Sequence, residues 1–542
     1  MIVTPEQLKI TRKEWECYID TPDDVIEQVN LELLSILNSS TSPRWAQKRI
    51  YDFFEKTINL DKNNLGAYNN LGASLQQLRR FEQAVKVYEK VLSFKPDFTD
   101  ALNNLATCFA NLKKYDQAIS YFEKILKINK NNSVVYNNLG NIYKELNQHK
   151  KSIENYNKAL EINPNYHLTY LNLGDTLIEL KDYNGALINY KKLIKLNPKH
   201  HFIEGKILHT NMQICNWENY ENDLKNLFQS LEKHEKIIDP FSIISITEKV
   251  DHQKRASEIF SNYKFPKQLE NKINSDKNNL KTRLGYFSPD FCDHPVLHLI
   301  FDVFKNHNKN KFEIFAFSFG PRKKDEMTEQ VKKYFNEFID INDKSDEEVS
   351  MLSRKMGIDI AIDLCGFTNF NRAGIFSHRA APLQVNFLGY PGTMGSAFID
   401  YLIADKIVIP EDQKLNYSEN IAYLPNCYQP NMAVKNISKT KITRNEEGLP
   451  ADAFVFCNFN SNYKITPEIF KVWMNILKNV SNSVLWLLET NNESSKNIIK
   501  EAKKNNINEN RIIFAKHLPN KDHLKRIELA DIFLDTFPYS AH

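Results

Sequence analysis

Two side chains suited to catalysis lie directly after apolar runs that predict buried strands. His294 ends the segment Ser288-Pro-Asp-Phe-Cys-Asp-His294, which follows the run 282–287. An imidazole titrates near neutral pH, so His294 can act as a base or a hydrogen-bond donor, or it can be an ordinary loop residue. Lys464 follows the run 454–459 and can neutralise a diphosphate leaving group, although a surface lysine is the simpler alternative.

A glycine-rich segment follows another predicted strand, at 384–388. In Gly389-Tyr-Pro-Gly-Thr-Met-Gly395, three glycines in seven residues permit close approach of the backbone to a ligand, and they equally permit a tight turn. The segment matches neither the dinucleotide fingerprint nor the P-loop. His298, four residues after His294, would share a helical face with it, but nothing else supplies ligands, so we expect no metal site.

A set of asparagines recurs every 34 residues. In a superhelix of helix pairs this position would line the concave face, where an amide, which both donates and accepts, can hold the backbone of an extended peptide. Alternatively, these side chains only cap or solvate their helices in an asparagine-rich chain. The four members of this asparagine ladder are Asn70, Asn104, Asn138 and Asn172.

The elements that carry the ladder are 34-residue repeats over 63–198. Each has a small residue, a second small residue, an aromatic residue and, in three of four units, a final proline. This is the pattern of tetratricopeptide repeats, in which paired helices bury their faces against neighbouring units. The first three slots are occupied by Gly72, Ala106, Gly140 and Gly174; by Ala84, Ala118, Ser152 and Ala186; and by Tyr88, Phe122, Tyr156 and Tyr190.

The other elements indicate a helical cap at 1–62 and a helical connector with a polar linker at 199–280. Strands and helices then alternate, which predicts parallel sheets whose ligands bind beyond the strands' carboxyl ends. A first lobe at 281–430 has expected strands at 282–287, 312–318, 358–364 and 384–388, with helices at 296–304 and 346–356. After a linker at 431–450, a second lobe at 451–542 has expected strands at 454–459, 483–488, 511–514 and 531–534.

Composition excludes several classes of function. The chain has 542 residues, and its 71 basic and 67 acidic residues give a net charge of +4, too balanced to indicate nucleic acid or membrane binding. Seven scattered cysteines without a CxxC pair suggest neither disulfides nor zinc, and fit a reducing cytosol. We find no secretory signal and no apolar run near the roughly 20 residues that span a bilayer, so we expect a cytoplasmic protein.

With the repeats, the Asp-His-Pro loop, GYPGT, CNFNxxYK and LADIFLDTFPY in view, the chain resembles the protein O-linked N-acetylglucosamine transferases of bacterial type and the related SPINDLY family, over about 63–542. This resemblance implies a repeat superhelix joined to a two-lobed GT-B glycosyltransferase. The reaction would be metal-independent, inverting transfer of N-acetylglucosamine from UDP-GlcNAc to Ser or Thr of acceptor proteins held by the asparagine ladder.

The resemblance also implies roles for single residues. His294 matches a histidine proposed as the base, and Lys464 the lysine on the UDP phosphates. Leu388 and Gly389 match residues near the sugar. The remaining donor-binding positions that the resemblance implies are Leu518, His523, Arg526 and His542, around the nucleoside and the diphosphate.

This chain departs from the animal enzymes at two positions, which weakens the transfer of donor identity: Ser461 replaces a glutamine and Asn520 a lysine. The chain stops at His542, where a doubly wound lobe would continue with a helix whose amides bind an anion. We therefore expect a fragment with an incomplete second lobe, which binds UDP weakly or not at all. The alternatives are a non-catalytic peptide-binding scaffold and a transferase of the same fold that uses GDP-fucose or UDP-glucose. Self-association into a homodimer is also possible.

Overall fold

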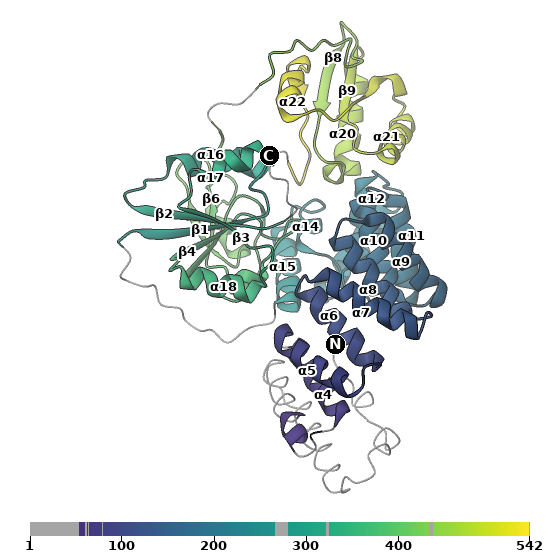
Figure 1. Ribbon diagram of the computed structural model, residues 1–542. Helices are drawn as coiled ribbons and strands as arrows, with labels where there is room; N and C mark the ends of the chain where they lie inside the picture. Colours follow the sequence, from purple (N-terminus) through teal and green to yellow (C-terminus); the bar gives the residue numbers. More distant parts are fainter. Residues whose placement is uncertain are drawn as a thin grey trace. The chain divides into compact units, whose positions relative to one another are not determined.

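The computed structural model describes residues 54–59, 62, 64–77, 80–265, 280–320, 325–432 and 437–540. The chain divides into two compact units, Met1–Thr176 and Leu177–His542. The division falls inside one helix, α10 (His167–Glu179), and Figure 1 shows the course of both units. Most of the expected N-terminal cap, and His542, lie outside the described residues.

The first unit consists of the predicted helix pairs, which confirms the repeats. Each pair is followed by a tight turn and then by the next pair. The helices are α4 (Leu65–Gln77), α5 (Phe81–Phe94), α6 (Thr99–Asn111), α7 (Tyr115–Ile128), α8 (Ser133–Glu145) and α9 (His149–Ile162). The last pair, α10 and α11 (Tyr183–Leu196), spans the division between the units.

The small slot of each repeat faces the aromatic slot. A Cβ atom added to Gly72 would lie 2.6 Å from Cε1 of Tyr88, and one added to Gly140 would lie 2.6 Å from Cδ1 of Tyr156. The Tyr156 hydroxyl donates to Oδ1 of Asn141 at 2.7 Å, which fixes the ring against the glycine. A small residue is therefore required because the ring occupies the space of a side chain.

Four helices connect the repeats to the first lobe. They are α12 (Ile203–Gln213), α13 (Tyr220–Glu232), α14 (Pro240–Ile243) and α15 (Val250–Lys264). Helix α14 begins after Asp239, whose carboxylate accepts from the amides of Phe241 and Ser242 at 3.1 and 3.0 Å.

The first lobe contains a parallel sheet of seven strands in the order β3-β2-β1-β4-β5-β6-β7. The four expected strands are β1 (Thr282–Ser288), β2 (Phe312–Ser318), β4 (Ile360–Asp363) and β5 (Leu383–Asn386). The sequence prediction missed β3 (Glu337–Asp340), β6 (Tyr401–Ala404) and β7 (Asn420–Tyr423). The helices that accompany the sheet are α16 (Pro295–Asn306), α17 (Glu326–Lys332), α18 (Asp346–Lys355) and α19 (Gly374–Ser377).

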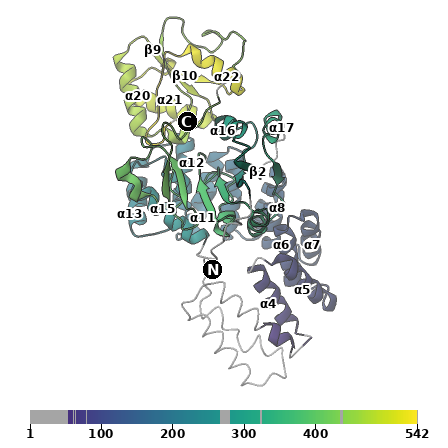
Figure 2. The same ribbon diagram turned by 90° about the vertical axis from the view of Figure 1, so that its left-hand side faces the viewer.

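The second lobe contains a parallel sheet of four strands in the order β10-β9-β8-β11. Figure 2 shows β9 and β10 together with the helices of this lobe. All four match the expected runs within a few residues: β8 (Phe454–Asn458), β9 (Ser483–Leu488), β10 (Ile512–Ala515) and β11 (Ile532–Phe533). The helices are α20 (Pro467–Asn479), α21 (Asn492–Lys504) and α22 (Asn520–Arg526), and a short turn of 3-10 helix, η2 (Asn462–Lys464), follows β8. Helical repeats followed by parallel α/β lobes confirm the predicted fold class.

Candidate functional site

The strand order of the first lobe brings three loops to one edge, two of which the sequence analysis singled out. β1 and β4 are neighbours, but the chain continues from β1 to β2 on one side and from β4 to β5 on the other. Such a switch point leaves a crevice at the carboxyl ends of the strands. The loops that follow β1, β4 and β5 carry His294, Gly366 and Gly389 respectively.

His294 caps α16. Its Nδ1 atom accepts a hydrogen bond from the amide of Val296 at 3.3 Å, and Oδ2 of Asp290 lies 3.6 Å from the same atom. With Nδ1 accepting, a neutral ring carries its proton on Nε2 and can donate to a ligand. If Nδ1 instead donates to Asp290, Nε2 becomes a base. Burial raises the pKa of Asp290, and His294 opposes that shift. The His294 side chain is 42% exposed, so a substrate can reach it.

Close packing accounts for the conformation of Leu388 and Gly389. Leu388 has a positive φ of 72°, a strained conformation for a residue with a side chain. A Cβ atom at Gly389 would overlap the carbonyl oxygen of Leu364 and lie 3.2 Å from Cα of Cys365. The loops after β4 and β5 therefore touch through their backbones, and this contact alone requires the glycine.

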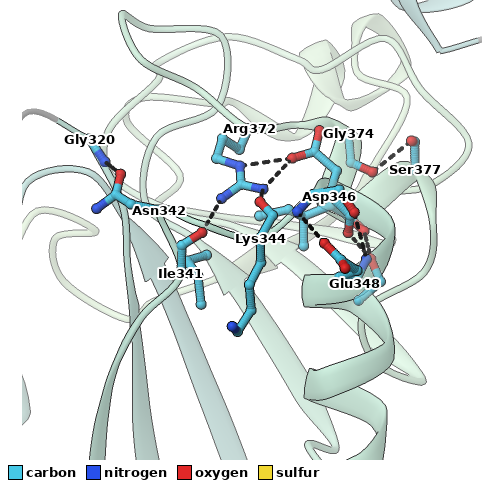
Figure 3. A network of polar contacts seen from close by, with 12 residues as sticks. Gly320, Ile341, Asn342, Lys344, Asp346, Glu348, Arg372, Gly374 and Ser377 are labelled. Carbon is cyan, nitrogen blue, oxygen red and sulfur yellow. Dashed lines mark hydrogen bonds and ion pairs between the residues drawn. The ribbon is translucent and has the colours of Figure 1, made fainter. Parts of the chain in front are cut away.

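Arg372 ties together three further segments of the same lobe (Figure 3). Its Nε atom donates to Oδ1 of Asp346 at 2.8 Å, and its Nη atoms donate to the carbonyls of Ile341 and Lys344 at 2.8 and 2.7 Å. Asp346 starts α18, and Ile341 follows β3. One guanidinium thus fixes the segments that border the carboxyl edge of the sheet on the β3 side.

Lys464 lies at the switch point of the second lobe, between β8 and β11. Its Nζ atom donates to the carbonyl of Ser540 at 3.0 Å and lies 3.8 Å from the centre of the Tyr539 ring. The residue is 6% exposed. Burial lowers the pKa of Lys464 to about 8, and the Asp535 carboxylate partly opposes this shift. A buried ammonium next to a carboxyl edge of the sheet is suited to binding an anion.

His523 and Arg526 lie together on α22, against aromatic rings. Nε of Arg526 donates to Nδ1 of His523 at 3.1 Å, and its guanidinium lies 5.2 Å from the Phe459 ring and 5.9 Å from the Trp486 ring. Burial, followed by the charge of Arg526, lowers the pKa of His523 to about 4, so this ring is neutral at pH 7. Arg526 is 1% exposed, and its Nη2 atom has no hydrogen-bond partner.

The other predicted positions of the second lobe are Leu518 and Asn520. Leu518 is half-buried between β10 and α22. Asn520, one of the departures from the animal enzymes, places its Nδ2 atom 3.4 Å from Nε2 of His298. The same His298 atom lies 2.6 Å from Oδ1 of Asp293, so this histidine pairs with a carboxylate. Within the described ranges, no group of three or more His, Cys, Asp or Glu could hold a metal ion.

The ladder asparagines bond along the repeat array. Nδ2 of Asn104 donates to Oδ1 of Asn69 at 3.3 Å. The amide of Asn138 makes the same contact with Asn103 at 3.5 Å, and the amide of Asn172 makes it with Asn137 at 3.0 Å. Each bond joins residues 35 positions apart. The side-chain oxygen of Asn138 also accepts from Nδ2 of Asn137 at 3.5 Å. The second amide hydrogen of Asn104, Asn138 and Asn172 remains to meet a peptide.

Sequence reasoning missed several residues of these sites. Phe459 lies within the CNFN segment, but its contact with Arg526 depends on an element 60 residues further on. Asp363, the last residue of β4, accepts from the amides of Cys365 and Gly366 at 2.9 and 3.1 Å, while its Oδ2 atom has no partner. Burial raises the pKa of Asp363 to about 6. Only its place at a strand end could have signalled it.

Comparison with known proteins identifies the family. The profile of glycosyl transferase family 41 matches residues 214–431 and 431–542, and tetratricopeptide-repeat profiles match 66–98, 97–165 and 133–199. The chain belongs to glycosyl transferase family 41. In the described part of this family 41 chain, no helix is long and apolar enough to cross a membrane.

Curated relatives share parts of this family 41 chain. A probable UDP-N-acetylglucosamine–peptide N-acetylglucosaminyltransferase SEC of Arabidopsis thaliana is 36% identical over 47% of this chain and 27% of the relative. A UDP-N-acetylglucosamine–peptide N-acetylglucosaminyltransferase of Caenorhabditis elegans is 24% identical, with 60% and 39% covered. A probable SPINDLY transferase of Arabidopsis thaliana is 31% identical, with 47% and 29% covered. The chain thus spans less than half the length of these relatives.

Among solved structures, a mutant of the O-GlcNAc transferase of Thermobaculum terrenum has a TM-score of 0.57 and 20% identity. The match covers 82% of this chain and 79% of that one. At this identity the likeness concerns the fold alone.

Proposed function

We propose that this protein transfers N-acetylglucosamine from UDP-GlcNAc to serine or threonine hydroxyls of proteins. The observation that carries the proposal is the buried Lys464 ammonium at the switch point of the second lobe, in a chain of glycosyl transferase family 41. A charge held in such a site is costly unless an anion neutralises it, and a nucleotide diphosphate is such an anion.

The proposed reaction is an inverting displacement. The acceptor hydroxyl oxygen attacks the anomeric carbon, the bond from that carbon to the UDP phosphate oxygen breaks, and the hydroxyl proton leaves. Lys464 stabilises the negative charge that develops on the departing diphosphate. His294 accepts this proton through Nε2, in the tautomer whose Nδ1 atom donates to Asp290. In the other tautomer, whose Nδ1 atom accepts from Val296, His294 only orients the substrate and a water molecule takes the proton.

The nucleoside would lie against Arg526 and the rings that surround it. The neutral His523 ring and the Phe459 ring give the base apolar contact, and the unpartnered Nη2 atom of Arg526 can donate to a carbonyl or ribose oxygen. Leu388 and Gly389 would border the sugar, and Leu518 the nucleoside. No metal is required, because protein donors supply the positive charge.

Repeats of this type bind peptides or proteins, and the asparagine ladder would hold the backbone of the acceptor. None of the six cysteines of the described residues forms a disulfide, which agrees with action in a reducing cytoplasm. A homodimer stays a prediction.

The test is sugar transfer from labelled UDP-GlcNAc to a library of serine- and threonine-containing peptides. We expect transfer by the unchanged protein, a loss of at least 100-fold in Lys464→Met, and little change in Lys471→Met, an exposed lysine of the same lobe. Faster transfer from GDP-fucose or UDP-glucose than from UDP-GlcNAc would show that the proposed donor is wrong while the proposed type of reaction stands. Peptide binding without turnover of any donor would favour the scaffold alternative, which the ladder alone supports.

A further inference from the structure

Helix α12 of the connector ends against the turn that carries Lys464. The last carbonyls of a helix lack partners within it, and here the second lobe supplies them. Nδ2 of Asn462 donates to the Gln213 carbonyl at 3.2 Å, and Asn491 donates to the same carbonyl at 3.1 Å. Nδ2 of Asn497 donates to the carbonyl of Ile214 at 2.8 Å. The end of α12 is therefore capped by side-chain amides of the second lobe.

An aromatic contact accompanies these hydrogen bonds. The His209 ring of α12 lies 4.9 Å from the Tyr463 ring, and the Phe241 ring of α14 lies 5.7 Å from Tyr463. Tyr463 and Asn462 are the two residues directly before Lys464, and all three form η2. Asn462 and Tyr463 are thus both held by the connector, and Asn462 also donates to Oγ1 of Thr490 in its own lobe.

The third residue of the turn points the other way. Lys464 reaches the Tyr539 ring and the Ser540 carbonyl, beyond β11. Asn462 is 2% exposed, so its amide cannot exchange the Gln213 carbonyl for water without opening the turn. Helix α12 itself packs against α11 and α14, so it presents a fixed surface to the turn.

We propose that the end of α12 is the positioning element for Lys464: Asn462, anchored on the Gln213 carbonyl, and Tyr463, packed on His209, hold the turn that keeps the ammonium in the anion site. Asn462 and His209 are positioning residues that act through Lys464. That this contact matters for catalysis rests on the proposed function. That α12 holds the turn in place does not depend on any substrate.

The primary experiment follows Lys464 itself, without substrate. The full chain is labelled with ε-13C-lysine, and the Lys464 resonance is assigned by its absence in Lys464→Arg. Loosening the turn lets water reach the ammonium, which moves its titration midpoint towards that of a free lysine. We expect an alkaline displacement of about one pH unit or more in Asn462→Ala and in His209→Leu.

Two matched variants separate positioning from general docking. Asn497→Ala removes an equivalent bond between the lobe and the connector but lies on α21, outside the turn. His209→Phe keeps an aromatic ring against Tyr463. Both should titrate as the unchanged protein does. An equal displacement in Asn497→Ala, or none in either Asn462→Ala or His209→Leu, would overturn the proposal. The two His209 variants decide the matter if Asn462→Ala does not fold.

Turnover provides the second readout. Asn462→Ala should lower kcat for sugar transfer about tenfold or more, because small misplacements of a catalytic group are costly, and leave KM for the acceptor peptide within about twofold. If no variant and not even the unchanged chain transfers sugar, while the Lys464 resonance behaves as expected, the proposed function fails and the positioning role stands. If Asn462→Ala shifts the titration of the Lys464 resonance but keeps a normal kcat, the contact with α12 does not contribute to catalysis.

Discussion

Replacing Lys464 by methionine should make the second lobe more stable at neutral pH. The lysine is buried at 6% exposure, and methionine has a similar length without the charge. The Asp535 carboxylate opposes the effect of burial but does not compensate for it fully, since the pKa of Lys464 is still lowered to about 8. The charged form is therefore held at a cost to folding.

The size of this cost follows from the pKa. A change from the ordinary 10.5 to about 8 corresponds to roughly 3 kcal/mol at 1.36 kcal/mol per unit. Methionine loses the hydrogen bond to the Ser540 carbonyl, worth about 1 kcal/mol, but Ser540 is exposed and water can replace the donor. The net gain of Lys464→Met at pH 7 is about 2 kcal/mol in the free energy of unfolding.

The gain should depend on pH in a defined direction. Because the folded pKa is lower than the unfolded pKa, the folded state binds fewer protons between pH 8 and 10.5, and the stability of the unchanged protein rises across this window. Below about pH 8 the penalty is fully present. The advantage of Lys464→Met is therefore largest at pH 7 and vanishes towards pH 10.5.

Urea denaturation followed by tryptophan fluorescence measures this difference. Trp473 and Trp486 are buried in the second lobe, and Trp217 packs against its Phe470 ring. Lys471→Met, an exposed lysine of α20, is the control and should change stability by less than about 0.5 kcal/mol. A loss of stability in Lys464→Met at pH 7, or a gain that is equal at pH 7 and pH 10, would refute the reasoning.

Three further substitutions test other parts of the structure. Asp363→Asn should raise stability by about 3 kcal/mol at pH 7.5, because burial raises the pKa of this carboxyl from 3.8 to about 6. The cost is present above pH 6 and disappears as the pH falls towards 4, so denaturation at pH 7.5 and pH 4 checks it. Gly140→Ala should destabilise α8 and α9 by about 1 kcal/mol despite its better helix propensity, since its Cβ meets Tyr156; Tyr156→Phe should restore part of the loss, as hydrogen exchange of these helices would show. Arg372→Ala should cost about 3 kcal/mol in urea denaturation, because it leaves the Asp346 carboxylate and two carbonyls without their donor, and lysine at this position should recover only a part.

The sequence predicted strands where apolar runs are continuous. β1, β2 and β9 have consecutive buried residues, and the expected runs match them within one residue. β3 and β7 are short, and each has residues that are half-buried or exposed rather than an apolar run. Edge strands of this kind have too few apolar residues to be recognised from the sequence. Their conformation is decided by pairing with a neighbouring strand.

The candidate site was predictable only in its strand-end positions. His294 and Lys464 follow strands that the sequence reveals, so their place at a carboxyl edge could be inferred. The neighbours that determine their chemistry could not. Tyr539 reaches Lys464 from 75 residues further along the chain, and Phe459 meets Arg526 across 67 residues. Such contacts depend on the strand order, which the sequence leaves open.

Three buried polar groups that destabilise the fold lie near the carboxyl ends of strands. Asp363 ends β4 with one unpartnered oxygen, Arg526 follows β10 with one unpartnered nitrogen, and Lys464 follows β8 with a lowered pKa. A core selected for stability alone would replace each of them with an apolar residue. The Arg526 guanidinium lies 3.7 Å from Oε2 of Glu447, which offsets part of its cost. The charge of Lys464 is less compensated, and an anionic ligand at this position would explain why the fold keeps it. If Lys464→Met stabilises the lobe but abolishes UDP binding, this trade between stability and binding accounts for the buried lysine.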